Sequence, residues 1–255
     1  MKWCFLALLI AGVAQAAVKT ETVEYKDGDV TLKGYLAYDD AKPGKRPGVL
    51  VIHEWWGLNE YAKSRAEQLA KLGYVAFAAD MYGDGFVTTS AEEAGKHAGQ
   101  FKEDRVAGRR RIRAGLAVLQ QQKLVDAHRI AAIGYCFGGT SVLELARSGA
   151  DVAGVVSFHG GLATPLPAKA GEVKAKVLVC HGADDAFESP AEIAAFQQEM
   201  REAGADWRMI YYGGALHSFT NPQSGKFGIP GVAYNEKADR RSWADMQQFF
   251  AEIFR

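Results

Sequence analysis

The chain of 255 residues has no excess of either charge, because 30 Lys and Arg balance 30 Asp and Glu. Proteins that follow the phosphate backbone of a nucleic acid usually carry a basic excess, so we expect no nucleic-acid partner. The 28 Gly and 7 Pro form no repeat, which argues against a fibrous or low-complexity protein. The composition therefore indicates a globular protein of a size that suits one large domain.

Long apolar runs are absent beyond the N-terminal segment. That segment has a positive Lys2, an apolar stretch over residues 4–13, and the small residues Ala14 and Ala16 around Gln15. The stretch is too short for a bilayer core of roughly 30 Å, so we expect no membrane span. We interpret residues 1–16 as a signal peptide cut after Ala16, which places residues 17–255 in the periplasm or outside the cell. A buried N-terminal helix is the alternative interpretation.

Cysteines are scarce, and cofactor motifs are missing. Signal cleavage leaves Cys136 and Cys180, too few for a disulfide framework. The sequence has no C-x-x-C or H-E-x-x-H pair, so we expect no metal site. It also has no phosphate-binding loop or dinucleotide fingerprint, so we expect no cofactor. Cys180 ends an apolar run and is interpreted as a small buried hydrophobic residue. His97, His128 and His159 are interpreted as surface or structural histidines.

Apolar runs typical of strands alternate with segments of helical periodicity. The strands are expected at residues 21–26, 31–38, 47–53, 74–79, 130–135, 152–158, 176–180 and 207–212. The helices are expected at residues 59–72, 101–122, 139–148, 189–203 and 235–254. This alternation predicts an α/β fold in which helices flank both faces of a mainly parallel sheet. Ligands of such sheets bind at the carboxyl ends of the strands.

The sharpest feature at a predicted strand end is Gly134-x-Cys136-x-Gly138. At a strand-to-helix junction this pattern indicates a tight turn that exposes a nucleophile, because side chains in place of the two glycines would collide with the neighbouring strand and the new helix. The positive end of the helix dipole favours a thiolate there. The N–H of Phe137 stays free to bind a developing oxyanion.

The order of later residues strengthens this interpretation. Asp184 and Asp185 follow the strand at 176–180, and His217 follows the strand at 207–212. Nucleophile, acid and histidine in this order are typical of the α/β-hydrolase triad. In such a triad the acid orients the histidine, and the histidine moves the proton of Cys136.

Several segments together make the chain resemble the dienelactone hydrolases, or carboxymethylenebutenolidases. They are HEWWGLNEY at 53–61, DMYGDG at 80–85, GYCFGG at 134–139, HGADD at 181–185 and HSFTNP at 217–222. The resemblance runs from about Pro47 to the C-terminus. It implies an α/β-hydrolase domain in which Cys136 is the nucleophile, His217 the base, and Asp185 rather than Asp184 the acid.

The resemblance also assigns roles to two residues that follow the strand at 47–53. It implies that Glu54 contacts the resting Cys136 and that the N–H of Trp55 helps to bind the oxyanion. A carboxylate beside the thiol would disfavour the thiolate until substrate binds. In an oxidising compartment this would protect the sulfur from oxidation.

One position departs from the family pattern. The dienelactone enzymes bind the substrate carboxylate with arginines, one of them four residues past the histidine, where this chain has Asn221. Arginines cluster instead at residues 109–113, which we interpret as a solvated or salt-bridged helix face near Glu103 and Asp104, with a partner-binding role as the alternative. An aromatic pocket wall is expected from Trp55, Trp56, Tyr82, Phe86 and Phe219.

These features predict a monomeric hydrolase that cleaves a small-molecule ester or lactone through an acyl-enzyme on Cys136. A general carboxylesterase or a thioesterase would use the same residues with a different pocket. A non-catalytic binding protein on the same fold is the remaining alternative.

Overall fold

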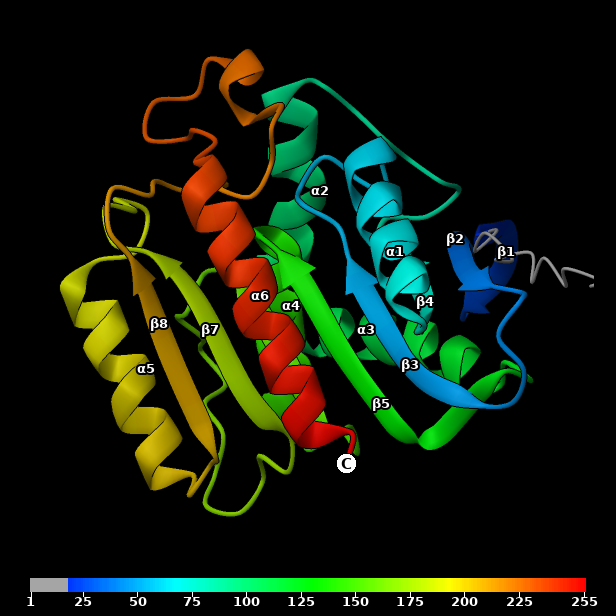
Figure 1. Ribbon diagram of the computed structural model, residues 1–255. Helices are drawn as coiled ribbons and strands as arrows, with labels where there is room; N and C mark the ends of the chain where they lie inside the picture. The colour runs from blue at the N-terminus through cyan, green and yellow to red at the C-terminus, as the bar shows by residue number, and fades with distance from the viewer. Residues whose placement is uncertain (1–17) are drawn as a thin grey trace, which may run out of the picture.

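The computed structural model describes residues 18–255, and eight strands of this part form one sheet in the order β1-β2-β4-β3-β5-β6-β7-β8 (Figure 1). The strands are β1 (Val18–Asp27), β2 (Val30–Asp39), β3 (Arg46–Ile52), β4 (Val75–Ala79), β5 (Val125–Tyr135), β6 (Gly154–Phe158), β7 (Lys176–Gly182) and β8 (Trp207–Tyr212). Strand β2 runs antiparallel to both its neighbours, and the other pairs are parallel. The predicted, mainly parallel sheet is confirmed, while the segment interpreted as a signal peptide lies outside the described residues.

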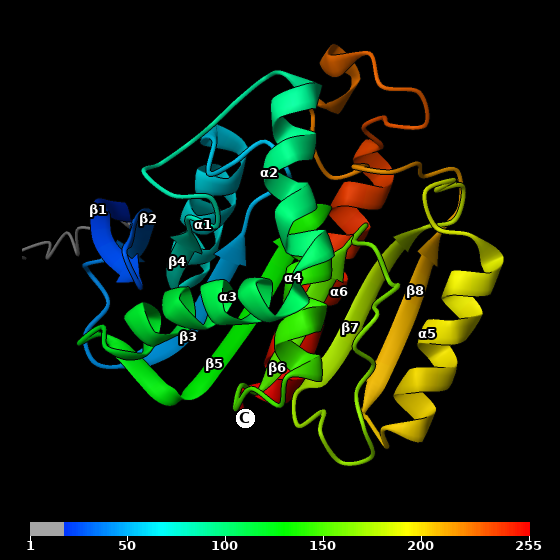
Figure 2. The same ribbon diagram turned by 180° about the vertical axis from the view of Figure 1, so that it is seen from behind.

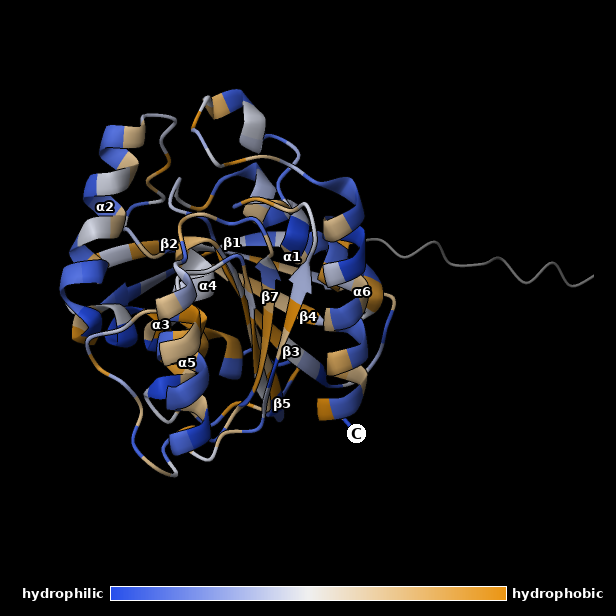
Figure 3. Ribbon diagram, turned by 90° about the vertical axis from the view of Figure 1, so that its left-hand side faces the viewer, coloured by the Kyte–Doolittle hydropathy of each residue, from blue (hydrophilic) through white to orange (hydrophobic). Residues whose placement is uncertain are grey.

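Helices cover both faces of the sheet (Figures 1 and 2). Helices α1 (Glu60–Leu72) and α6 (Glu236–Ile253) pack into one apolar layer, and α2 (Ala91–Glu103), α3 (Arg105–Gln120), α4 (Phe137–Arg147) and α5 (Pro190–Glu202) into the other. Figure 3 shows mainly apolar strands between helices in which polar and apolar residues alternate. Within residues 18–255, none of the helices combines the length and apolarity needed to cross a bilayer.

Local sequence signals explain where several elements begin and end. The Asn59 side chain accepts the Ala62 N–H at the start of α1, and Gly73 ends this helix with a φ of 102°. Ser189 and Glu192 form a capping box at the start of α5. Because these caps satisfy backbone groups that would otherwise lack partners, they fix the helix boundaries.

The helix predicted at residues 101–122 is confirmed over most of its length as α3, but its predicted start is wrong. The chain forms α2 and α3 instead, with a break at Asp104, whose side chain accepts the Ala107 N–H and so caps α3. Helix α2 was not predicted at all, because its sequence reads as a polar loop.

Three of the four arginines at 109–113 form salt bridges, but not with Glu103 or Asp104, and Arg113 donates to Ser148 instead. Arg110 and Arg111 both pair with Asp27 at the end of β1, and Arg109 pairs with Glu144 of α4. The cluster therefore ties α3 to the β1 end of the sheet and to α4.

A tight turn joins β5, near the centre of the sheet, to α4. Cys136 occupies this turn with φ 54° and ψ −114°, a strained conformation for a residue with a side chain. A Cβ on Gly134 would lie 2.0 Å from the Gly138 carbonyl oxygen, and a Cβ on Gly138 would lie 2.3 Å from the Ile52 oxygen of β3. The predicted steric need for both glycines is confirmed.

We predict that Gly138→Ala lowers the free energy of unfolding by about 1–3 kcal/mol, because the new methyl group must push α4 away from β3. Gly99→Ala in α2 is the matched control, since its added Cβ has no atom within 4 Å and alanine favours a helix by up to ~1 kcal/mol. Urea denaturation of both variants measures the difference. Equal stabilities for the two variants would contradict the steric argument.

Candidate active site

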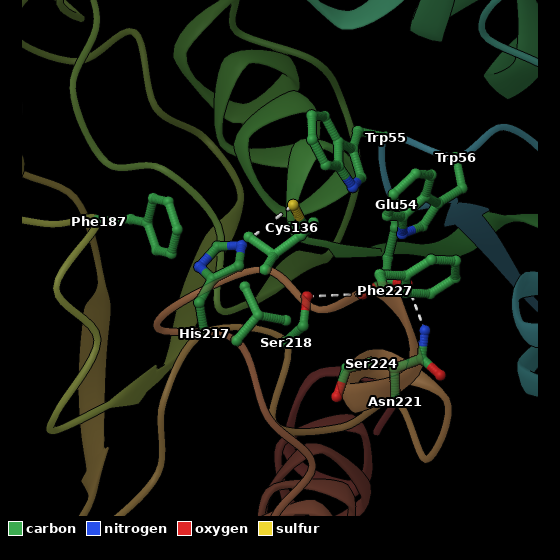
Figure 4. A pocket seen from close by; sticks show the side chains of 12 residues that line it. Glu54, Trp55, Trp56, Cys136, Phe187, His217, Ser218, Asn221, Ser224 and Phe227 are labelled. Carbon is green, nitrogen blue, oxygen red and sulfur yellow. Dashed lines mark hydrogen bonds between the residues drawn. The ribbon is translucent and has the colours of Figure 1, made fainter. Parts of the chain in front are cut away.

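Three side chains meet at the carboxyl edge of the sheet, and Figure 4 shows two of them, Cys136 and His217. Cys136 Sγ lies 3.1 Å from His217 Nε2, and His217 Nδ1 lies 2.8 Å from Asp185 Oδ2. Cys136 comes from the β5–α4 turn, Asp185 from the loop after β7, and His217 from the loop after β8. Asp184, the other acid at that strand end, is exposed. The structure therefore brings together the three residues that the sequence predicts as nucleophile, acid and base.

The contacts of His217 favour its charged form. Burial by itself would lower the pKa of His217, but Cys136 and the buried carboxylate of Asp185 raise it well above the usual range. The other oxygen of Asp185 accepts the Phe187 N–H at 3.0 Å, so the carboxylate is held in place. This arrangement stabilises an imidazolium next to the sulfur, which is what removal of the thiol proton requires.

Glu54 takes part in a different set of contacts from the one expected. Its two oxygens accept hydrogen bonds from Ser218 Oγ at 2.9 Å and Asn221 Nδ2 at 2.6 Å. The sulfur faces His217 instead, and no hydrogen bond joins it to Glu54 among the described residues, although both residues line the same cavity. Burial raises the pKa of Glu54, and the two hydrogen bonds oppose this rise. Glu54 thus connects the loop after β3 to the segment that follows His217.

His159 lies directly behind the nucleophile, at the end of β6. Its Nδ1 accepts the backbone N–H of Cys136 at 3.1 Å, so its Nε2 carries the proton and donates to Thr220 Oγ1 at 2.7 Å. Burial lowers the pKa of His159 well below the usual range, and His217 lowers it further. A neutral His159 therefore supports the strained turn, in keeping with the structural role expected from the sequence. Its position at the end of a parallel strand is the signal that links it to the site.

A cavity of about 220 Å³ opens at Cys136. Its polar lining residues are Glu54, Cys136, His217, Ser218, Asn221 and Ser224. Its apolar lining residues are Trp55, Trp56, Phe187, Phe227, Ile229 and Val232. In Figure 4, Phe187 lies on the His217 side of the sulfur and the two tryptophans lie on the opposite side. The cavity is thus an apolar chamber with the reactive groups at one wall.

The lining of this cavity agrees only in part with the lining predicted from the sequence. Trp55 and Trp56 line it as expected, but the expectation for Tyr82, Phe86 and Phe219 is wrong. Tyr82 lies behind the wall instead, where its hydroxyl donates to the Trp55 carbonyl at 2.9 Å. The missed residues are Phe187, two positions after Asp185, and the segment after His217 that carries Phe227, Ile229 and Val232.

The segment after His217 folds back so that its far end, at Gly231 and Ala233, is hydrogen-bonded to His217. The N–H of His217 donates to the Gly231 carbonyl, and the N–H of Ala233 donates to the His217 carbonyl, both at 3.2 Å. Residues 218–232 therefore form a closed loop over the cavity, anchored at the base itself. Within residues 18–255, no group of three or more His, Cys, Asp or Glu is arranged to hold a metal ion.

We predict that Asp185→Asn lowers the pKa of His217, because it removes a carboxylate that favours the charged imidazole. In the wild-type protein the imidazole should keep its proton above the pH at which free histidine loses it. NMR titration of the His217 ring signals measures both effects. Asp184→Asn is the matched control and should leave the titration unchanged, and an equal shift in both variants would contradict the assignment of Asp185.

Comparison with known proteins agrees with this geometry. The model of the dienelactone hydrolase family matches residues 32–254. A Synechocystis protein that carries the provisional name carboxymethylenebutenolidase is 27% identical, over 91% of this chain and 96% of that protein.

Solved structures give the same result. A dienelactone hydrolase-like promiscuous phosphotriesterase from metagenomic libraries has a TM-score of 0.90 and 44% identity, over 94% of this chain and 100% of that one. A dienelactone hydrolase from Anabaena variabilis, 21% identical, has the same fold with a TM-score of 0.65, over 93% of this chain and 99% of that one. The match of the family model over most of the chain leads to one conclusion: this protein is a hydrolase with the α/β-hydrolase fold and belongs to the dienelactone hydrolase family.

Proposed function

We propose that this hydrolase cleaves an ester or lactone through a Cys136–His217–Asp185 triad and an acyl-enzyme intermediate. The observation that carries the proposal is the 3.1 Å separation of Cys136 Sγ and His217 Nε2 at the wall of an apolar cavity. The name of the Synechocystis relative, carboxymethylenebutenolidase, supports an ester or lactone as the bond that is cleaved.

In the first half of the reaction, the sulfur of Cys136 attacks the carbonyl carbon while His217 holds the thiol proton. The carbonyl π electrons move onto oxygen, and the resulting oxyanion is bound by the N–H groups of Phe137 and Trp55. Phe137 is the first residue of α4, so its N–H has no partner within the helix. Each donor of this kind is typically worth ~3 kcal/mol of the barrier. Collapse of the oxyanion breaks the C–O bond, and His217 gives its proton to the leaving oxygen.

In the second half, His217 takes a proton from water as the water oxygen attacks the thioester carbonyl. The C–S bond breaks, the acid product leaves, and the proton held by His217 returns to the sulfur. Asp185 stabilises the imidazolium in both halves. Glu54 takes no proton in these steps, and its hydrogen bonds to Ser218 and Asn221 hold the segment that follows His217.

The same residues would serve a general carboxylesterase or a thioesterase. Rates across acyl chains of increasing length, compared with rates for lactones, separate these functions. A non-catalytic binding protein is disfavoured, because such a protein has no need of a strained cysteine held against a histidine–carboxylate pair.

We predict that Cys136→Ala lowers kcat/KM for aryl esters by about 10³-fold or more, because no other described group replaces the sulfur. Intact-mass measurement of the quenched wild-type reaction should show one acyl group, mapped to Cys136 by peptide analysis. Cys180→Ala is the matched control, since Cys180 is fully buried and lies outside the cavity lining. Unimpaired hydrolysis by Cys136→Ala, or acyl groups on another residue, would contradict the mechanism.

We also propose that residues 1–16 are a signal peptide and that the mature enzyme works in the periplasm or outside the cell. N-terminal sequencing after expression in a Gram-negative host should give a chain that begins at Ala17 in the periplasmic fraction. Ala14→Arg and Ala16→Arg should block the cut, because the cleavage site requires small residues. A full-length chain confined to the cytoplasm would contradict this proposal.

A further inference from the structure

The walls of the cavity at Cys136 are built from stacked aromatic and aliphatic side chains. Trp55 packs against Trp56 with ring centroids 4.7 Å apart, and Trp56 stacks on Phe227 at 4.1 Å. Ile229 and Val232 extend this apolar surface along the loop over the cavity. A substrate group that enters here exchanges water for aromatic and aliphatic carbon.

The polar groups of the cavity are mostly engaged with one another. Ser218 Oγ and Asn221 Nδ2 both donate to Glu54, and Asn221 Oδ1 accepts the Gln223 N–H at 2.9 Å. Ser224 lines the cavity, and its buried hydroxyl has no hydrogen-bond partner among the described residues. Apart from Cys136 and His217, the polar side-chain groups of the lining outside these contacts are uncharged, namely the Ser224 hydroxyl and the indole N–H groups of Trp55 and Trp56.

Among the described residues, the one cationic group of the lining is the imidazolium of His217, which is already paired with Asp185 and faces Cys136. Within residues 18–255, the lining contains neither Lys nor Arg. Arg65, behind Glu54, donates to the Thr220 carbonyl at 2.7 Å and pairs with Asp239 at 2.6 Å. Lys226 belongs to the loop over the cavity, but its side chain is exposed and is not part of the lining.

An anionic acyl group in this cavity would lose its hydration without gaining an unpaired cation, and it would lie near the carboxyl group of Glu54. An unpaired charge in apolar surroundings is costly, whereas an uncharged group of the same shape gains from burial. We infer that the active site takes neutral, apolar esters or lactones and rejects substrates that carry a carboxylate on the acyl part. This inference rests on the proposed function and specifies its substrate class.

The test compares two esters that differ in a single group, 4-nitrophenyl hexanoate and the 4-nitrophenyl monoester of adipic acid. The second has a carboxylate where the first has its terminal methyl group. We expect kcat/KM of the wild-type enzyme to favour the hexanoate by roughly a hundredfold, which corresponds to about 2.7 kcal/mol. Calorimetric titration of Cys136→Ala with the same two esters should show the same preference in Kd without turnover.

The two measurements separate failure of the inference from failure of the proposed function. Equal or better use of the adipate ester by the wild-type enzyme would overturn the inference and leave ester hydrolysis standing. If the wild-type enzyme hydrolyses neither ester, the proposed function fails. The ratio of the two Kd values for Cys136→Ala then still decides the charge preference, and equal values overturn it.

A charge added to the cavity tests the cause of the preference. Ile229→Arg places a cation on the lining, and Ile229→Gln is the matched control with a polar but uncharged side chain. We expect the arginine variant alone to raise kcat/KM for the adipate ester relative to the hexanoate, roughly tenfold for an ion pair worth about 1.4 kcal/mol. An equal gain in the glutamine variant would show that missing charge is not what excludes the anion, and would overturn the inference.

Discussion

The active site depends on one contact, the hydrogen-bonded approach of the Cys136 sulfur to the imidazole of His217. The two residues lie 81 positions apart in the chain, so local structure cannot bring them together. The parallel sheet does so, because the loops after β5, β7 and β8 all emerge at the same edge. Close packing between β3 and α4 then sets the position of the sulfur, since the chain passes Ile52 at a distance that only glycine permits at position 138.

Glu54 makes the environment of this contact unusual for a thiol enzyme. A carboxyl group that is 2% exposed carries a desolvation cost, which two hydrogen bonds reduce. The donors, Ser218 and Asn221, lie on the segment that follows His217. Glu54 therefore fixes the loop whose two ends meet at the base, and the same loop supplies Phe227 and Ile229 to the cavity. The position of the base and the shape of the cavity are coupled through one buried carboxyl group.

Most of the sheet and the three reactive residues could be predicted from the sequence, because they leave local signals. Buried parallel strands such as β4 read as short apolar runs, and the glycines around Cys136 follow from steric limits on a tight turn. The break at Asp104 was not predicted, because the sequence alone does not distinguish an Asp that caps a new helix from an Asp on the exposed face of a continuous one. The partners of Arg110 and Arg111 were missed because Asp27 lies on a distant strand. Phe187 and Phe227 lie in irregular loops, where no periodicity tells which side chains face the cavity.

Under the proposed function, Asn221 is a position that can change the substrate without changing the chemistry. At the place where the resemblance leads one to expect an arginine, this chain has an amide that donates to Glu54 and accepts from Gln223. An amide can satisfy a buried carboxyl group without adding charge, so Glu54 keeps its place while the cavity gains no cation for a substrate carboxylate. The triad is held by other contacts, through Asp185 and the turn at Cys136, and does not require the arginine. In the proposed function, reaction chemistry and charge selectivity therefore reside in separate sets of side chains, so that the first can stay the same while the second changes.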